Sequence, residues 1–202
     1  MDVGIFGAGH FGLSLAALFD RAGHTVHIAG RRPVQLSKTL AEQGLRHTRA
    51  ESLDDVFDSS ALLVGAVQWL DLAALAAQLP DLEGKIWIDP ANPYTRAEDG
   101  SVSAVPTDGR PHSAIVADLV GRAQLVKAFN GFTTPMFRSG PLTSQGRIVA
   151  PIAGDHPAAL CRVAELIKPT GFMPIIVGNL TDSVVLEPGG ALRALSNPLI
   201  AP

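Results

Sequence analysis

The stretch that decides the fold is VGIFGAGHFG, residues 3–12. Its first four residues, Val3 to Phe6, predict a short buried strand, and a glycine loop follows directly. Leu13 to Ala22 has helical periodicity, and Gly23-His24 ends this helix as a C-cap would. Thr25 to Ala29 (TVHIA) predicts a second strand. The start of the chain therefore forms a β–α–β unit, in which a right-handed crossover joins parallel strands.

The same stretch contains the spacing G-x-G-x-x-G, as Gly7-Ala8-Gly9-His10-Phe11-Gly12. We expect Gly7 to allow the tight turn out of the strand, Gly9 to let a pyrophosphate approach the backbone, and Gly12 to let helix and sheet pack closely. Free N–H groups and the dipole at the helix N-terminus favour an anion there. Because the motif follows a strand and opens a helix, all six residues are predicted to bind a dinucleotide; the alternative is a glycine-rich turn without a ligand.

The end of the second strand predicts which dinucleotide binds. Proteins that bind NAD carry Asp or Glu at this point, where it holds the ribose 2′-hydroxyl. Here the sequence reads Ile28-Ala29-Gly30-Arg31-Arg32-Pro33, without a carboxylate. Guanidinium groups suit a 2′-phosphate because they donate two hydrogen bonds to it at once. We predict NADP(H), with Arg31 as the main contact to the phosphate and adenine, Arg32 supporting it and Gly30 in the same site; a solvated pair of surface arginines is the alternative.

The rest of the chain continues the alternation of strands and helices. Strands are predicted at 61–67, 85–89, 124–129, 148–154 and 173–177, and helices at 33–43, 70–79, 113–119 and 157–167. Residues 93–111 predict a loop, Ser113 caps the helix after it, and the tail from Leu180 is Pro-containing and poorly helical. We predict an α/β fold with a doubly wound, mostly parallel sheet of the Rossmann type: one NADP-binding domain over residues 1–202, with 140–202 as a small C-terminal α/β extension packed on it.

The composition indicates a globular protein and gives no sign of a nucleic acid or a membrane surface as partner. The chain has 202 residues, 47% hydrophobic and 17% charged, with a net charge of −3. No Lys/Arg cluster indicates a nucleic acid or a membrane surface as partner. The apolar N-terminal stretch lacks a basic start and is broken by glycines, so we expect neither a signal peptide nor a membrane span. Cys161, the single cysteine, is predicted to be a core residue in a reducing, cytoplasmic protein.

Six segments form a pattern wider than the glycine motif. They are GIFGAGHFG (4–12), Gly30-Arg31-Arg32, Val67-Gln68-Trp69, IDPANP (88–93), VKAFN (126–130) and Ala153-Gly154-Asp155. Together they resemble the NADPH:coenzyme F-420 (deazaflavin) oxidoreductase family, over nearly the whole chain, and they are similar to the dinucleotide domain of the transmembrane ferric reductases. The resemblance implies reversible hydride transfer between NADP(H) and a planar deazaflavin. It implies no catalytic side chain and no metal, since holding two rings together is the main requirement.

The resemblance also implies which loops hold the nicotinamide. They follow the strands at their carboxyl ends, where open α/β sheets bind ligands, and contain Ala66, Val67, Gln68, Asn92, Pro93 and Asn130. Three positions depart from the family: Gly30 replaces a frequent hydroxyl residue, Gln68 a common proline and Gly131 a frequent threonine. These departures concern the second substrate more than NADP(H).

Three functions therefore stay open. The first is a deazaflavin-dependent NADP oxidoreductase; the second is an NADPH-dependent reductase of a flavin, imine, quinone or carbonyl metabolite; the third is an NADPH sensor without turnover. We expect a homodimer, because the residues after the sixth strand are too few for a domain that covers the substrate. The sequence leaves open the direction of the reaction and whether His10, Trp69 or Glu187 contacts the second substrate. It also leaves open whether Phe129, Phe132 and Phe137 are core residues or a wall for a planar ring.

Overall fold

A computed structural model describes residues 1–97, 99–193 and 200–201. The strands are β1 (Asp2–Phe6), β2 (Thr25–Ala29), β3 (Thr48–Glu51), β4 (Leu62–Gly65), β5 (Ile86–Asp89), β6 (Tyr94–Arg96), β7 (Val102–Ala104), β8 (Gln124–Ala128), β9 (Leu142–Thr143), β10 (Gly146–Gly154), β11 (Met173–Gly178) and β12 (Ile200–Ala201). The helices are α1 (His10–Arg21), α2 (Pro33–Glu42), α3 (Leu53–Ser59), α4 (Leu72–Ala76), α5 (His112–Val120), α6 (Thr134–Ser139) and α7 (Pro157–Ile167), with the 3-10 helices η1 (Trp69–Asp71), η2 (Lys168–Thr170) and η3 (Thr181–Leu186).

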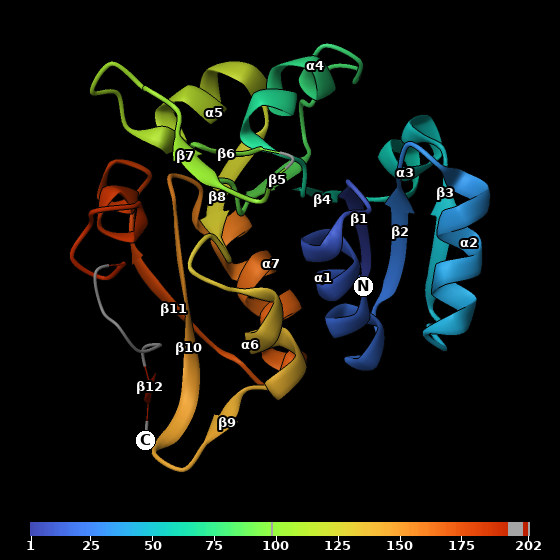
Figure 1. Ribbon diagram of the computed structural model, residues 1–202. Coiled ribbons are helices and arrows are strands. Elements are labelled where there is room, and N and C mark those ends of the chain that lie inside the picture. Colours follow the sequence, from blue (N-terminus) through green and yellow to red (C-terminus); the bar gives the residue numbers. More distant parts are fainter. Residues whose placement is uncertain (98, 194–199, 202) are drawn as a thin grey trace.

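The central sheet has the strand order β11-β10-β8-β5-β4-β1-β2-β3, and β9 and β12 pair with β10 (Figure 1). Strands β1 to β5 and β8 run parallel, whereas β10 is antiparallel to β8 and β11 is parallel to β10. The chain winds outward from β1 in both directions, so the strand order reverses between β1 and β4. This mostly parallel α/β sheet confirms the predicted fold class, and the reversal marks the edge at which such sheets bind ligands.

Two hydrophobic cores lie on opposite faces of the sheet, because successive strand residues point to opposite sides. Ile5 packs in the core covered by α1, α2, α6 and α7. Its neighbour Phe6 packs in the core of α3, α4 and α5, where its ring stacks on Trp87 with 6.0 Å between centroids. The two layers of helices explain why the inner strands are mostly apolar.

Several elements differ from the sequence-based prediction. Neither β3 (TRAE) nor α3 was predicted. β3 has no apolar run, because it is a short, polar edge strand with one neighbour. The loop predicted over 93–111 contains the antiparallel strands β6 and β7, which are too short to show alternation. The helix predicted at 70–79 is shorter and begins as the 3-10 turn η1. The predicted tail lies partly outside the described residues, and its first part forms η3.

Two single-residue predictions are wrong. Ser113 does not cap α5, because the N-cap is Pro111 and Ser113 is buried inside the first turn. Cys161 is exposed on α7, whereas its neighbours Leu160 and Val163 are buried. Helical periodicity located the helix but placed Cys161 on the wrong face. No helix within the described ranges is both long and apolar enough to cross a bilayer.

Candidate dinucleotide-binding site

The glycine loop joins β1 to α1 at the carboxyl edge of the sheet. Gly7 has a φ of +112°, which L side chains rarely adopt, and a Cβ there would overlap the carbonyl oxygen of Ala66. A Cβ on Gly12 would overlap the carbonyl oxygen of Gly7, so the first turn of α1 lies directly against the loop. Gly9 differs, because it is exposed and no atom lies within 4 Å of its Cβ position. Backbone atoms of the protein therefore pack against the loop at Gly7 and Gly12, whereas the space beside Gly9 is open to solvent.

The N-terminus of α1, beside this loop, has the properties of an anion site. Among the described residues no side chain caps the helix, and its first turn contains no acidic residue. The N–H groups of that turn therefore have no helical partner, and the helix dipole adds partial positive charge. His10 opens the helix and is exposed to solvent. A pyrophosphate fits this position.

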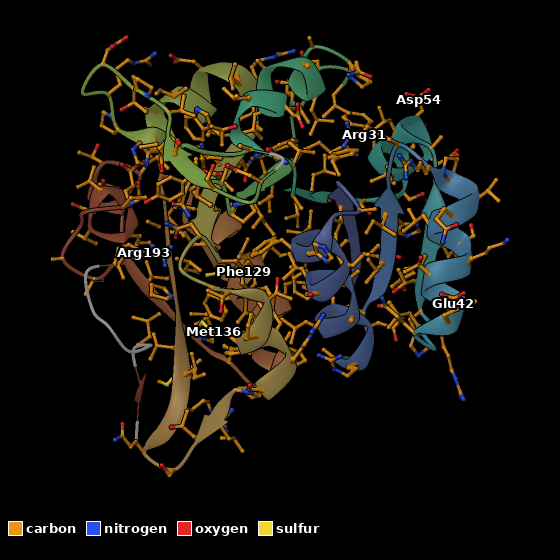
Figure 2. The ribbon with its side chains drawn as sticks, in the orientation of Figure 1. Arg31, Glu42, Asp54, Phe129, Met136 and Arg193 are labelled. Atoms are coloured by element: carbon orange, nitrogen blue, oxygen red, sulfur yellow. The ribbon has the colours of Figure 1, made fainter. Side chains whose placement is uncertain are left out.

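Arg31 and Arg32 lie just beyond the carboxyl end of β2 and both are exposed. The amide of Gly7 donates to the carbonyl oxygen of Ala29 at 3.0 Å, which ties the glycine loop to this strand end. Figure 2 shows Arg31 at the same edge of the sheet as the end of β1. Within the described ranges neither guanidinium group forms an ion pair. Both arginines are therefore free to bind a phosphate next to the loop.

Asn92 and Asn130 connect the loops that follow β5 and β8. Nδ2 of Asn92 donates to the backbone oxygen of Asn130 at 2.8 Å, and Nδ2 of Asn130 donates to Oδ1 of Asn92 at 3.2 Å. Nδ2 of Asn130 also donates to the carbonyl oxygen of Leu186 at 2.7 Å. The predicted residues of these two loops therefore share one network, and it extends to the C-terminal segment.

A buried ion pair links β5 and β8, the strands that precede these two loops. Nζ of Lys127 lies 2.8 Å from Oδ2 of Asp89, and both side chains are 0% exposed. The same Nζ donates to the carbonyl oxygen of Ala91 at 2.6 Å, while the amide of Ala91 donates to Oδ1 of Asp89 at 2.9 Å. Both of these hydrogen bonds are made to Ala91, in the turn that leads from β5 into Asn92. The pair fixes the relative position of the ends of β5 and β8.

Phe129 has an unusual backbone conformation directly before Asn130. Its φ is +62°, and a non-glycine residue in this region costs roughly 1–3 kcal/mol, so the conformation persists only where packing enforces it. The ring is buried against Phe132 and Phe137, with centroid distances of 5.5 and 6.2 Å. The three phenylalanines are therefore core residues, and their packing sets the direction in which the chain enters the Asn130 loop.

A second buried polar cluster joins α5 to the residue after η3. Oε1 of Glu187 accepts a hydrogen bond from the backbone amide of Ser113 at 3.0 Å, and Oε2 lies 3.4 Å from Nδ1 of His112. The hydroxyl of Ser183 donates to that of Ser113 at 2.8 Å. Burial lowers the pKa of His112, an effect that the charge of Glu187 opposes, while the more distant charges of Lys127 and Asp89 lower and raise it. The ring of His112 also contacts Trp69, with 5.9 Å between centroids.

Comparison with known proteins identifies the family. The family model described as NADP oxidoreductase, coenzyme F420-dependent, matches residues 2–93. The hypothetical protein SMa0349 of Sinorhizobium meliloti is 30% identical, with a TM-score of 0.82 over 100% of this chain and 94% of that chain. The chain belongs to this family of NADP oxidoreductases.

Two further proteins are similar to this NADP oxidoreductase. Metalloreductase STEAP3 of Rattus norvegicus is 27% identical over 188 residues, which are 92% of this chain and 35% of that protein. The chain spans about a third of the length of the curated relatives it matches. A protein of Arthrobacter sp. FB24 that carries the provisional name F420-dependent NADP-reductase has the same fold, with a TM-score of 0.77 over 91% of this chain and 87% of that chain at 24% identity.

The structure places the predicted site residues of this oxidoreductase along one edge of its sheet. Gln68 is exposed, whereas Ala66 and Val67 are half-buried and Pro93 is buried. Trp69 is half-buried on His112, and Glu187 is buried and bonded to α5. The sequence reading predicted no role for Lys127. A charged residue within the apolar strand QLVKAF is the signal that could have identified it as one half of a buried pair.

Proposed function

We propose that this NADP oxidoreductase transfers hydride between NADP(H) and a deazaflavin coenzyme. The observation that carries the proposal is the match of residues 2–93 to a family of coenzyme F420-dependent NADP oxidoreductases. The proposed anion site at α1 and the two arginines, which form no ion pair with any described residue, fit NADP(H) as one partner. When bound, the nicotinamide supplies the hydride at its C4 carbon.

The residues of the chain act by binding and positioning. The glycine loop and the first turn of α1 hold the pyrophosphate, and Arg31 with Arg32 holds the 2′-phosphate. The loops containing Gln68, Asn92 and Asn130 hold the nicotinamide end. Because the Asn92–Asn130 network and the Lys127–Asp89 pair fix two of these loops before a ligand binds, little ordering is left for the moment of reaction.

Arg31→Ala is expected to raise the Kd for NADPH by roughly 10–100-fold, because a charge-assisted hydrogen bond contributes about 1.5–3 kcal/mol. The Kd for NADH, which lacks the 2′-phosphate, should change less than threefold. Titration of the intrinsic fluorescence of the wild-type and variant proteins with both nucleotides measures the four constants. Equal losses for NADPH and NADH would contradict the assignment of Arg31 to the 2′-phosphate.

The acceptor is tested by following NADPH absorbance at 340 nm with oxidised deazaflavin and, in parallel, with flavin, quinone, imine and ferric substrates. We expect rapid oxidation only with the deazaflavin. A second candidate, reduction of another acceptor, is favoured by the similarity to metalloreductase STEAP3. NADPH oxidation by ferric iron alone would support that candidate, and tight NADPH binding without any turnover would support a sensor.

Two expectations about the whole protein remain proposals. We propose a homodimer in the cytoplasm that binds neither a nucleic acid nor a membrane. Light scattering coupled to gel filtration tests the dimer, because a mass of one chain at all concentrations would contradict it. The single cysteine is compatible with a reducing compartment.

A further inference from the structure

The cluster around His112 lies beside the cofactor loops but belongs to none of the roles assigned above. Trp69, which contacts the imidazole ring, comes one residue after Gln68 in the loop after β4. Glu187, whose Oε2 lies 3.4 Å from Nδ1 of this ring, comes one residue after Leu186, whose carbonyl oxygen accepts the hydrogen bond of Asn130. His112 thus contacts two segments that both adjoin the proposed nicotinamide site.

The two nitrogens of this ring have different surroundings. Nδ1 is buried, faces Oε2 of Glu187 at 3.4 Å and forms no hydrogen bond at that distance. No described residue forms a hydrogen bond with Nε2 on the opposite edge of the ring, and 13% of the side chain remains exposed. A histidine with a carboxylate at Nδ1 and a free Nε2 can exchange a proton with a ligand at Nε2. Catalytic hydrogen bonds such as that between Nδ1 and the carboxylate often become shorter only when the substrate binds.

Glu187 is itself held in place, which distinguishes the pair from a flexible surface contact. Its Oε1 accepts from the amide of Ser113 at the first turn of α5, and its side chain is 8% exposed. One carboxylate oxygen therefore accepts a hydrogen bond from the first turn of α5, and the other faces the imidazole ring. The hydrogen bond to Ser113 thus holds Glu187 with its other oxygen towards Nδ1.

The proposed reaction requires a proton that the nicotinamide does not supply. Reduction of the acceptor by NADPH adds one hydride, and the acceptor nitrogen that gains the electron pair must take up one proton. We propose that His112, oriented by Glu187, is the catalytic residue that exchanges this proton with the second substrate. This assignment rests on the proposed function. His112 donates the proton from Nε2 during NADPH oxidation, and solvent then reprotonates the ring; in the reverse reaction the neutral ring accepts the proton.

The direction of the pH dependence follows from the charges around the ring. Burial lowers the pKa of His112, Glu187 raises it, and Lys127 and Asp89 act in opposite senses from β8 and β5, so the pKa lies below its usual value of 6.5. NADPH oxidation needs the protonated ring, so its initial kcat should fall as pH rises through that pKa. NADP⁺ reduction needs the neutral ring, so its initial kcat should rise over the same range.

The test compares wild type, His112→Gln, Glu187→Gln and the matched control His47→Gln, which alters an exposed histidine just before β3. In His112→Gln we expect kcat to fall about 100-fold, at the lower end of the usual contribution of an acid–base group, with both pH limbs flattened and the Kd for NADPH unchanged. In Glu187→Gln the limbs should move to lower pH, because the charge that raises the pKa of His112 is lost. His47→Gln should match wild type.

A second measurement does not depend on turnover. The imidazole signals of the protein, with that of His112 assigned by its loss in His112→Gln, are titrated by NMR with and without NADP⁺ and deazaflavin. We expect the His112 signal to titrate below pH 6.5 and to shift when deazaflavin is added. Unchanged pH limbs in His112→Gln, or a signal that deazaflavin leaves in place, would overturn the assignment while the proposed function stands. A wild-type protein that does not oxidise NADPH with deazaflavin would overturn the acceptor, and this assignment with it.

Discussion

Lys127→Met is expected to lower the free energy of unfolding by about 3–5 kcal/mol, the usual effect of removing one partner from a buried ion pair. The Asp89 carboxyl group, which is 0% exposed, would lose the cation that lies 2.8 Å from its Oδ2. Because small domains are stable by only about 5–15 kcal/mol, this single change should leave the protein close to unfolding. Urea denaturation followed by circular dichroism measures the loss.

The matched control for Lys127→Met removes both charges. In the double variant Lys127→Met/Asp89→Asn no uncompensated charge remains, so most of the stability should return. A residual loss of about 1 kcal/mol is expected, because the carbonyl oxygen of Ala91 would lose the hydrogen bond from Nζ. If the double variant were no more stable than the single one, the loss would come from the missing attraction within the pair, and the explanation through the buried charge would be wrong.

The second large effect is expected in the glycine motif, where a substitution at Gly12 should lower stability and one at Gly9 should weaken NADPH binding. Gly12→Ala is expected to destabilise the protein by about 3 kcal/mol or more, because the added Cβ would overlap the backbone oxygen of Gly7 and the main chain would have to move. Gly9→Ala should leave stability within about 0.5 kcal/mol of wild type, since Gly9 has a φ of −76° and open space at its Cβ position.

Binding should show the opposite pattern for Gly9→Ala. If the pyrophosphate occupies the open space above Gly9, the methyl group should raise the Kd for NADPH roughly 10–100-fold, about 1.4–2.8 kcal/mol. Thermal unfolding and NADPH titration of both variants provide the two measurements. A Gly9→Ala protein that binds NADPH as tightly as wild type would exclude the glycine loop as the pyrophosphate site, even if Gly12→Ala unfolds the protein as expected.

The sequence predicted the first β–α–β unit because its signals are local. Strand β2 lies at the predicted residues 25–29, and α7 at the predicted residues 157–167. The apolar runs, the helical period and the glycines each act over a few residues, so their meaning does not depend on the rest of the chain. The edge strand β3 and the strands β6 and β7 were not predicted, because a short strand with one neighbour does not need an apolar pattern.

The candidate site divides in the same way. The glycine loop and the Arg31-Arg32 end of β2 could be named from sequence, since both are single continuous segments. The role of Ser113 was predicted incorrectly, because its partner lies in a distant segment of the chain. Its backbone amide donates to Glu187, which is 74 residues away, and no local pattern distinguishes a serine that caps a helix from one whose amide binds a distant carboxylate.

By itself, the sequence determined the Rossmann-type β–α–β start, the glycine loop between β1 and α1 and the cationic end of β2, because backbone conformation and periodicity are encoded within each segment. Only the tertiary structure decided that Lys127 meets Asp89 across 38 residues, that Phe129 adopts a positive φ before Asn130, and that His112 faces Glu187. These contacts depend on which strands become neighbours. That choice minimises the free energy of the whole packed sheet, so distance along the chain does not reveal it.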